Sequence, residues 1–264
     1  MKGPLQSTTW CGKERFHFEI IDSTNKKAKE LSKEGCKHGT LITADSQQAG
    51  IGRRGRSWSS EKGAGIYMTM LLRPQIKTEH VSSLTLVAAI SVAKAIDEII
   101  NDEANEIEIK IKWPNDIVIN RKKICGILTE LSLEGCNIES LVIGIGINVL
   151  NQTFPDEIKE TASSIFLETQ KEIEKEELIE QVWKNFEYYY DLFLQTQDLQ
   201  GLKNDYESML ANQNQIVKVL DPNGEYEGIA RGITNTGELL VETEQGICQV
   251  SSGEVSVRGI CGYV

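Results

Sequence analysis

Alternating or continuous apolar runs recur through the first 150 positions of the chain, a pattern typical of strands. Isoleucines at positions 107, 109 and 111 alternate with charged residues, which predicts a half-exposed strand. Continuous apolar runs predict buried strands at 40–44, 66–72, 117–119, 124–133 and 141–148. The polar residues Asn120 to Lys123 predict a hairpin turn between two of these strands.

Three segments have the apolar period or the end signals of helices. The run 84–100 is the most apolar of them, but Thr85, Lys94 and Asp97 interrupt it, so it predicts a core helix and not a membrane span. The segment 171–193 is amphipathic, with apolar residues at 178, 182, 186 and 190. A shorter helix is predicted between a hydroxyl N-cap in the segment 22–25 and a stop at Gly35.

The pattern changes beyond about position 212, where short apolar segments alternate with turns. The predicted strands are 216–219, 227–230, 239–241, 247–250 and 255–257, and the predicted turns are 221–224 and 235–237. Five short strands in about fifty residues predict a small barrel resembling an SH3 fold. We therefore predict an α+β protein with one large domain, residues 1–211, and a small β domain, residues 212–264.

Composition narrows the classes of partner. The 264 residues include 39 acidic and 28 basic ones, and at a net charge of −11 no general affinity for nucleic acid is expected. The first residues lack the apolar stretch of a secretory signal, so a cytoplasmic protein without a membrane segment is expected. The six cysteines and three histidines show no metal-ligand spacing, and the sequence therefore locates no metal ligands.

The segment Gln47 to Trp58 contains three glycines and three arginines. Glycine allows close approach of the backbone to a ligand, and each guanidinium matches a carboxylate or phosphate. Gly50, Gly52 and Gly55 also match the dinucleotide-binding pattern, but no apolar helical period follows them, so the required strand–helix context is missing. A local group of cations in an acidic chain favours a small anionic ligand.

A second polar segment, Lys112 to Asp116, follows the strand predicted at 107–111, and Lys123 and Gly126 lie just beyond it. Pro114 ends that strand. The two segments together supply cations for a reaction in which two anions must be brought together. They indicate nucleotide chemistry on a carboxylate, and Asp116 is expected to hold Lys112 or a magnesium ion.

The chain resembles the biotin protein ligases over nearly its whole length. The landmarks occur in the family's order and are Ser23-Thr24-Asn25, the 47–58 loop with Arg53 and Arg56, Lys112–Asp116, Lys123–Leu128, Gly144–Asn148 and Gly253–Arg258. The resemblance implies a mixed central sheet flanked by helices, like that of class II aminoacyl-tRNA synthetases, followed by an SH3-like C-terminal domain. Residues 1–211 would then be the catalytic ligase domain. Since about twenty residues precede the first landmark, it also implies the monofunctional class without an N-terminal DNA-binding domain.

The reaction implied by the resemblance uses ATP and biotin as substrates. Biotin's carboxylate attacks the α-phosphorus of ATP, which releases pyrophosphate and forms biotinyl-5′-adenylate. A lysine of the biotin carboxyl carrier protein of a biotin-dependent carboxylase then receives the biotin. Mg²⁺ is expected to arrive with the phosphates, and homodimers are common in the family.

The resemblance also implies roles for individual residues. The catalytic residues would be Arg53, Arg56 and Lys123. The biotin-binding residues would be Ser23, Thr24, Asn25, Gln47, Gly50, Ile51, Gly52, Arg53, Trp113, Lys123 and Gly126. The nucleotide-binding residues would be Arg53, Arg56, Trp58, Lys112, Asn115, Asp116, Asn148, Glu254 and Arg258.

Several of these residues also have plainer explanations. Ser23 and Thr24 fit helix caps, Trp113 fits core packing beneath biotin's rings, and Asn115 and Asn148 fit amides that satisfy strand ends. Two enzyme classes share the carboxylate activation, because lipoate ligases and octanoyltransferases use the same fold for another acyl group. A catalytically silent biotin-binding module is the alternative from another class, and an NAD-linked oxidoreductase ranks last.

Ile51 is a departure from the family pattern. Bacterial members typically read Gly-Arg-Gly-Arg-x-Gly-Arg in this loop, and Ile51 stands where the first arginine is expected. Because Arg53 and Arg56 remain, catalysis is expected to survive, with weaker ordering of the loop. The loop from Gly50 to Ser57 is expected to be disordered without ligand and to be ordered by biotin or its adenylate.

Overall fold

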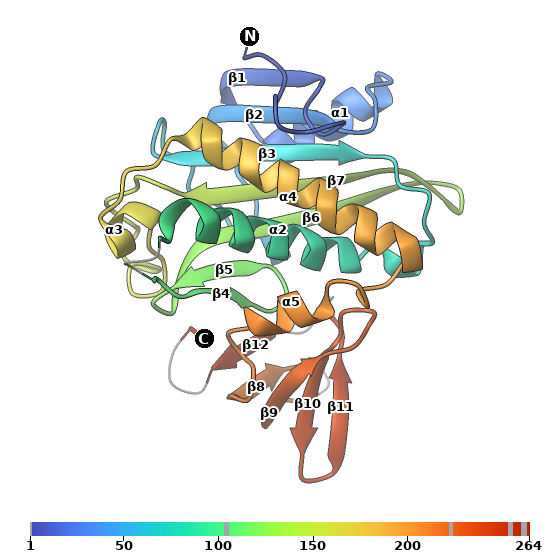
Figure 1. Ribbon diagram of the computed structural model, residues 1–264, viewed down its shortest axis with the longest axis vertical. Helices are drawn as coiled ribbons and strands as arrows, with labels where there is room; N and C mark the ends of the chain where they lie inside the picture. Colours follow the sequence, from blue (N-terminus) through green and yellow to red (C-terminus); the bar gives the residue numbers. More distant parts are fainter. Residues whose placement is uncertain (1, 103–105, 222–223, 253–255, 260–262) are drawn as a thin grey trace.

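The computed structural model describes residues 2–102, 106–221, 224–252, 256–259 and 263–264. A seven-stranded sheet forms the centre of the large domain (Figure 1). Its strands, in spatial order, are β1 (Arg15–Ile21), β2 (Thr40–Gln47), β3 (Gly65–Leu72), β7 (Asn137–Asn148), β6 (Lys122–Glu134), β5 (Asp116–Ile119) and β4 (Ile109–Lys112). Only β1 and β2 pair in parallel, so the sheet is mixed, as the family resemblance implies.

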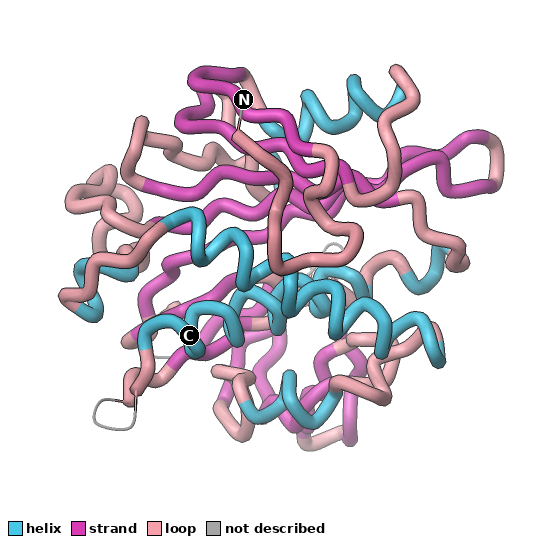
Figure 2. The backbone as a smooth tube through the Cα atoms, turned by 45° about the horizontal axis from the view of Figure 1, so that its top comes forward, coloured by secondary structure: helices cyan, strands magenta, loops and turns pink. Residues whose placement is uncertain are grey.

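Two long helices, α2 (Ser83–Ile100) and α4 (Lys175–Thr196), lie side by side over one face of this sheet (Figure 2). Helix α2 contacts β4, β5 and β6 on one side and α4 on the other, which explains why apolar residues occupy nearly all of its surface. Both helices were predicted, although α4 begins at Lys175 and not at position 171.

Helix α1 (Thr24–Lys33) packs on the opposite face of the sheet, against β2, β3 and β7. Ala28 and Leu31 meet Ile42 and Leu71 there, whereas Leu41, the neighbour of Ile42, belongs to the core under α2 and α4. Successive strand residues point to opposite faces, so β2, β3 and β7 each supply residues to two separate cores.

The predicted ends of α1 are confirmed. The Ser23 side chain accepts a hydrogen bond from the backbone N–H of Lys26 at 3.5 Å and caps the helix. Gly35 follows the helix with φ of +91°, a conformation that glycine adopts without the penalty of a side chain. The cap therefore holds the backbone of the first turn, which carries Thr24 and Asn25.

The turn between β5 and β6 is shorter than predicted. Asn120 and Arg121 have positive φ values of 48° and 65°, as in a two-residue hairpin, and β6 begins at Lys122. Lys123 therefore lies on a strand and not in the turn. Its backbone N–H donates to Thr161 O at 2.8 Å, and its carbonyl accepts from Ser163 N at 2.9 Å.

Some elements differ from the prediction. Strand β1 was not predicted, and β4 begins at Ile109, so that Ile107 lies outside it. The short helices α3 (Ile165–Thr169) and α5 (Lys203–Ser208), and the 3₁₀ turns η1 (Arg53–Gly55) and η2 (Thr78–His80), were also missed. Their brevity leaves no periodic apolar signal.

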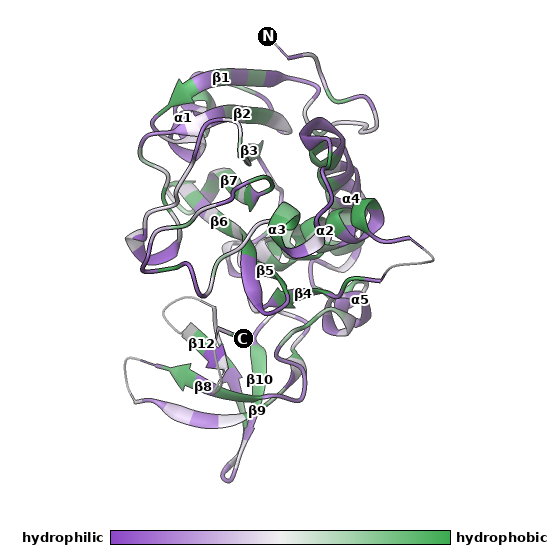
Figure 3. Ribbon diagram, turned by 90° about the vertical axis from the view of Figure 1, so that its left-hand side faces the viewer, coloured by the Kyte–Doolittle hydropathy of each residue, from purple (hydrophilic) through white to green (hydrophobic). Residues whose placement is uncertain are grey.

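All five strands predicted in the small domain are present, and they form one antiparallel sheet in the order β11-β10-β9-β8-β12. They are β8 (Ile216–Leu220), β9 (Tyr226–Ile233), β10 (Leu239–Thr243), β11 (Gly246–Val250) and β12 (Ser256–Gly259). Figures 1 and 3 place this sheet next to β4 and β5. The buried indole of Trp113 donates to Gly237 O at 2.9 Å and thereby joins the two domains.

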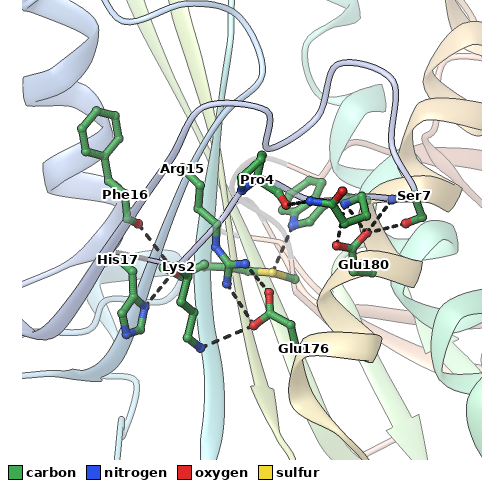
Figure 4. Close-up of polar contacts among 12 residues, drawn as sticks. Lys2, Pro4, Ser7, Arg15, Phe16, His17, Glu176 and Glu180 are labelled. Carbon is green, nitrogen blue, oxygen red and sulfur yellow. Dashed lines mark hydrogen bonds and ion pairs between the residues drawn. The ribbon is translucent and has the colours of Figure 1, made fainter.

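The first residues of the chain run along α4 and are held by its carboxylates. Glu176 contacts Lys2 and Arg15, and Glu180 contacts Ser7 (Figure 4). Further along the same helix, Glu187 is 8% exposed. No helix in the described ranges has both the length and the apolar character to cross a membrane.

Glu187 accepts hydrogen bonds from three successive backbone N–H groups, those of Thr9, Trp10 and Cys11, at 2.6 to 3.0 Å. Burial alone raises the pKa of this carboxyl, but the hydrogen bonds from Cys11, Thr9 and Trp10 outweigh burial and lower the pKa below its ordinary value. The charged form of Glu187 therefore fastens the N-terminal segment to α4.

Replacing Glu187 by Gln should lower the free energy of unfolding by about 1–3 kcal/mol at neutral pH, because a charged acceptor of several N–H groups is lost. Because the folded pKa is lowered, the stabilisation is present above the ordinary pKa of about 4.3 and is lost as the pH falls below it. Urea denaturation at neutral pH and at a pH below that pKa measures the loss of stability and its pH dependence. Glu177→Gln, an exposed carboxylate of α4, is the control. Equal stability losses in the two variants would contradict the role of Glu187.

Candidate functional site

A lateral row of paired residues crosses the large sheet from β4 to β3. The pairs are Lys112 with Asp116, Asp116 with Gly126, Gly126 with Gly146, and Gly146 with Tyr67. Directly paired residues project from the same face of a sheet. This is the face that carries α1, which packs mainly on β2, β3 and β7 and reaches β6 through the bonds of Asn25 to Leu128 and Glu130. Gly126 and Gly146 therefore form a floor without side chains, with Lys112 and Asp116 beyond it.

The indole ring of Trp58 lies directly on this glycine floor. A Cβ atom added at Gly146 would lie 2.5 Å from Cε2 of Trp58, and one added at Gly126 would lie 2.9 Å from Cζ3. Both positions therefore require glycine for the close approach. The Trp58 Nε1–H group is buried and has no hydrogen-bond partner among the described residues. The ring centroid is 5.4 Å from Nζ of Lys123.

The arginine-rich loop links the antiparallel strands β2 and β3, which confirms that the dinucleotide-binding context is absent. Within it, Trp58 N donates to Gly50 O at 2.8 Å, and Gly52 N donates to Arg56 O at 2.7 Å. An added Cβ at Gly50 would meet Trp58 O at 2.6 Å. The side chain of Ile51, the departure from the family pattern, is largely exposed.

Arg53 reaches from this loop to two other parts of the chain. Its Nη1 donates to Asn115 Oδ1 at 2.8 Å, and its Nη2 donates to the Ser252 carbonyl in the small domain. Burial lowers the pKa of the guanidinium, while the nearby Asp116 raises it. The group remains a cation at neutral pH because its ordinary pKa is far above 7. Arg56 is exposed at the end of the same loop.

Thr24 and Gln47, both predicted to bind biotin, are in direct contact. Gln47 Oε1 accepts from Thr24 N at 2.9 Å and from Thr24 Oγ1 at 3.1 Å, and Gln47 Nε2 donates to Ser60 Oγ at 3.0 Å. Thr69 Oγ1, on β3, lies 2.8 Å from Thr24 Oγ1. Ser23, beside them, has the capping role that its residue type alone indicated.

The amide of Asn25 is held by protein groups at both ends. Its Oδ1 accepts from Thr69 at 2.7 Å, and its Nδ2 donates to Glu130 Oε2 at 2.8 Å. An added Cβ at Gly144 would lie 2.0 Å from Asn25 Oδ1, so that glycine makes room for the amide. Thr69 and Glu130 were not predicted, and the only signal for them was a polar residue inside an apolar strand.

Asp116 pairs with Lys123, and not with Lys112 as was expected. Lys123 Nζ lies 2.7 Å from Asp116 Oδ1. Lys112 Nζ instead lies 3.4 Å from the ring centroid of Tyr263, whose hydroxyl donates to Asp116 Oδ2. Burial lowers the pKa of Lys112 to about 8, against the opposing effect of Asp116. Tyr263 was not among the predicted site residues.

The remaining predicted residues lie around this centre. Asn115 Nδ2 donates to Ile127 O at 2.9 Å, and Asn148 Nδ2 donates to Ser163 O at 3.0 Å, so both amides satisfy backbone groups near strand ends. Arg258 is exposed on β12, and Glu254 lies outside the described residues. Within the described ranges, no group of three or more His, Cys, Asp or Glu side chains has a geometry suited to a metal ion.

Two family profiles match the chain. The Biotin/lipoate A/B protein ligase family matches residues 17–148, and the Biotin protein ligase C terminal domain matches residues 214–258. The crystal structure of biotin protein ligase from Aquifex aeolicus in complex with biotin and ATP is similar, with a TM-score of 0.81 and 32% sequence identity. That similarity covers 94% of this chain and 99% of the Aquifex chain.

Curated relatives match a similarly large share of the chain. The bifunctional ligase/repressor BirA of Bacillus subtilis (strain 168) is 38% identical over 252 residues, which are 95% of this chain and 76% of BirA. The biotin–[acetyl-CoA-carboxylase] ligase of Paracoccus denitrificans is 29% identical over 90% of this chain and 98% of its own length. These matches confirm the predicted fold class, the SH3-like C-terminal domain and the resemblance: the chain belongs to the biotin protein ligase family.

Proposed function

We propose that this chain activates biotin with ATP to form biotinyl-5′-adenylate and then transfers the biotin to a lysine of a biotin carboxyl carrier protein. The observation that carries the proposal is the position of the cations. Lys112, Lys123 and Arg53 converge beside one glycine floor, around Asp116 and Asn115. Membership in the biotin protein ligase family favours biotin over lipoate or octanoate as the acid.

The glycine floor and the contacts at α1 suit the two halves of biotin. Thr24 and Gln47 present hydroxyl and amide groups that can bond to a ureido ring, and the capped first turn of α1 fixes the Thr24 backbone. The glycines at 126 and 146 let the indole of Trp58 lie close to the sheet, where its ring can pack against an apolar ring or chain. Trp58 contributes an aromatic face and one N–H donor that no described residue uses.

The cations act on the adenylation step. Biotin's carboxylate oxygen attacks the α-phosphorus, the bond to the bridging oxygen breaks, and pyrophosphate leaves with the electron pair. Two anions must approach before this bond forms, so positive charge fixed at the site lowers the barrier more than an acid–base pair would. We assign Arg53 and Lys123 to the reacting groups, and Lys112 to the phosphates.

The transfer step needs no further cation. The carrier lysine, as a neutral amine, attacks the carbonyl carbon of the mixed anhydride, AMP leaves with the electron pair of the broken bond, and the amine proton passes to solvent. The same positive charge stabilises the AMP that departs. Partial exposure of the loop from Gly50 to Ser57 leaves the carrier an approach to the site.

The described residues do not fit a resident Mg²⁺ site. Both oxygens of Asp116 take hydrogen bonds or an ion pair from other side chains. We propose that Mg²⁺ enters as part of the ATP substrate, bound mainly by phosphate oxygens and water. We also propose a cytoplasmic location, a domain boundary at 211/212 and a homodimer.

The first test is biotin-dependent release of pyrophosphate from ATP, compared with lipoate and octanoate. We expect release with biotin, and a loss of about 100-fold or more in kcat in Arg53→Ala and in Lys123→Ala, because each removes charge fixed at the reacting groups. Lys37→Ala, at an exposed lysine, is the control. Release with only the other acids would place the chain in the lipoate branch, and release with none would favour the silent binding module.

Activity should also depend on the charge of Lys112. Since its pKa is about 8, the ammonium loses its proton as the pH rises above that value, and kcat/KM for ATP should fall between about pH 7 and about pH 9.5. Lys112→Met should have a low kcat/KM that does not fall further over this range. A wild-type profile parallel to that of the Met variant would show that the charge of Lys112 is not used.

The loop should become more protected when ligand binds. We expect amide hydrogen exchange from Gly50 to Ser57 to slow by about tenfold or more with biotin and ATP, because Arg53 and Trp58 gain contacts there. The β10–β11 hairpin serves as the internal reference. Full protection of the loop in the ligand-free protein would contradict this expectation.

A further inference from the structure

Tyr263 contacts two of the predicted nucleotide-binding residues, Lys112 and Asp116, although it is far from both in sequence. Its ring faces Lys112 of β4, and its hydroxyl contacts Asp116 of β5. The next residue, Val264, accepts a hydrogen bond from Arg121 Nη2 at 2.7 Å through its backbone oxygen. The segment 263–264 is thus attached to β4, β5 and the turn that follows β5.

The hydroxyl of Tyr263 completes the hydrogen bonding of Asp116. Oδ1 of this carboxylate takes Lys123 Nζ at 2.7 Å and Asn115 Nδ2 at 3.1 Å, and Oδ2 takes the phenol hydroxyl. Burial and the nearby Asp116 raise the pKa of Tyr263, so the phenol remains protonated and serves as a donor. No other described residue donates to Oδ2.

This arrangement fixes the rotation of the carboxylate. With a donor on each oxygen, Asp116 cannot turn to share both oxygens with Lys123, and the ammonium stays on Oδ1. Lys123 is also held at its backbone by Thr161 and Ser163. The remaining freedom of its side chain is therefore governed by Asp116, and hence by Tyr263. Reacting groups must be placed to within about 0.5 Å for efficient catalysis.

The ring of Tyr263 has a separate effect on Lys112. This lysine is 6% exposed, and its ammonium lies over the aromatic face at 3.4 Å. The ammonium of Lys112 is opposed by three like charges, those of Lys123, Arg258 and Arg56. The carboxylate of Asp116 favours its charged form. An aromatic face stabilises a desolvated cation among other cations.

We propose that Tyr263 is a positioning residue for adenylation: its hydroxyl aligns Lys123 through Asp116, and its ring supports the charge of Lys112. The inference rests on the proposed function. It names a residue from the segment after β12 that acts on the reaction without contacting the reacting atoms. The two parts of the side chain have separable effects, because one acts on alignment and the other on charge.

Two variants separate these effects. Tyr263→Phe removes the hydroxyl and keeps the ring, so kcat for biotin-dependent pyrophosphate release should fall about tenfold while the KM values for ATP and biotin change less than about threefold, because all the charges remain. Tyr263→Leu also removes the ring, so the KM for ATP should rise in addition. Tyr188→Phe, at a tyrosine 59% exposed on α4, is the matched control.

A measurement without substrates gives an independent readout. The reaction of Lys123 with acetic anhydride, followed by peptide mass spectrometry, requires its amine to leave Asp116. Labelling of Lys123 should be about three- to tenfold faster in Tyr263→Phe than in the wild type, with Lys37 as the internal reference. Thermal unfolding of each variant checks that the fold is retained.

The outcomes are distinguishable. A wild type that releases no pyrophosphate with biotin would defeat the proposed function, while the labelling of Lys123 would still decide the position of its amine. An active wild type with Tyr263→Phe equal to Tyr188→Phe in kcat, or unchanged labelling of Lys123, would overturn the role of the hydroxyl. A lower KM for ATP in Tyr263→Leu would show that the ring blocks the nucleotide, and would overturn the role of the ring.

Discussion

Every strand of the large sheet has to serve two faces with one sequence, and the site depends on how this constraint is met. One face is covered by α2 and α4, so most of the residues that point toward them are apolar. The other face carries the short helix α1, which packs mainly on β2, β3 and β7. Residues pointing to the uncovered part need no apolar packing. Glycines, lysines and a carboxylate occupy it, in register across four strands.

The cations at this face are held by the protein itself. Lys123 has Asp116, Lys112 has an aromatic ring, and Arg53 has an amide and a carbonyl. These partners offset the mutual repulsion of the three neighbouring basic residues when no anion is bound. The positive field of the site therefore exists before an anionic substrate arrives.

Local patterns in the sequence predicted the helices and strands whose formation depends on neighbouring residues. The apolar periods predicted α2, α4, the central strands and all five strands of the small sheet, and hydroxyl and glycine signals predicted the ends of α1. Strand β1 escaped prediction because, as an edge strand, it is only partly buried on both faces. Asp116 was expected to hold Lys112 or a magnesium ion. Its ion-pair partner is Lys123, and this pairing depends on the register of β5 with β6 and on the position of Tyr263, which local patterns do not reveal.

The contacts of Ser252 and Tyr263 give the site a wide span along the chain. Arg53 in the β2–β3 loop meets a carbonyl 199 positions later, and Asp116 meets a hydroxyl 147 positions later. During synthesis on the ribosome, the large sheet and the helix α4 that covers it can form before these residues emerge, because the last strand, β7, ends at Asn148 and α4 ends at Thr196. The nascent chain thus has a folded sheet with incompletely held cations for as long as synthesis of the small domain takes.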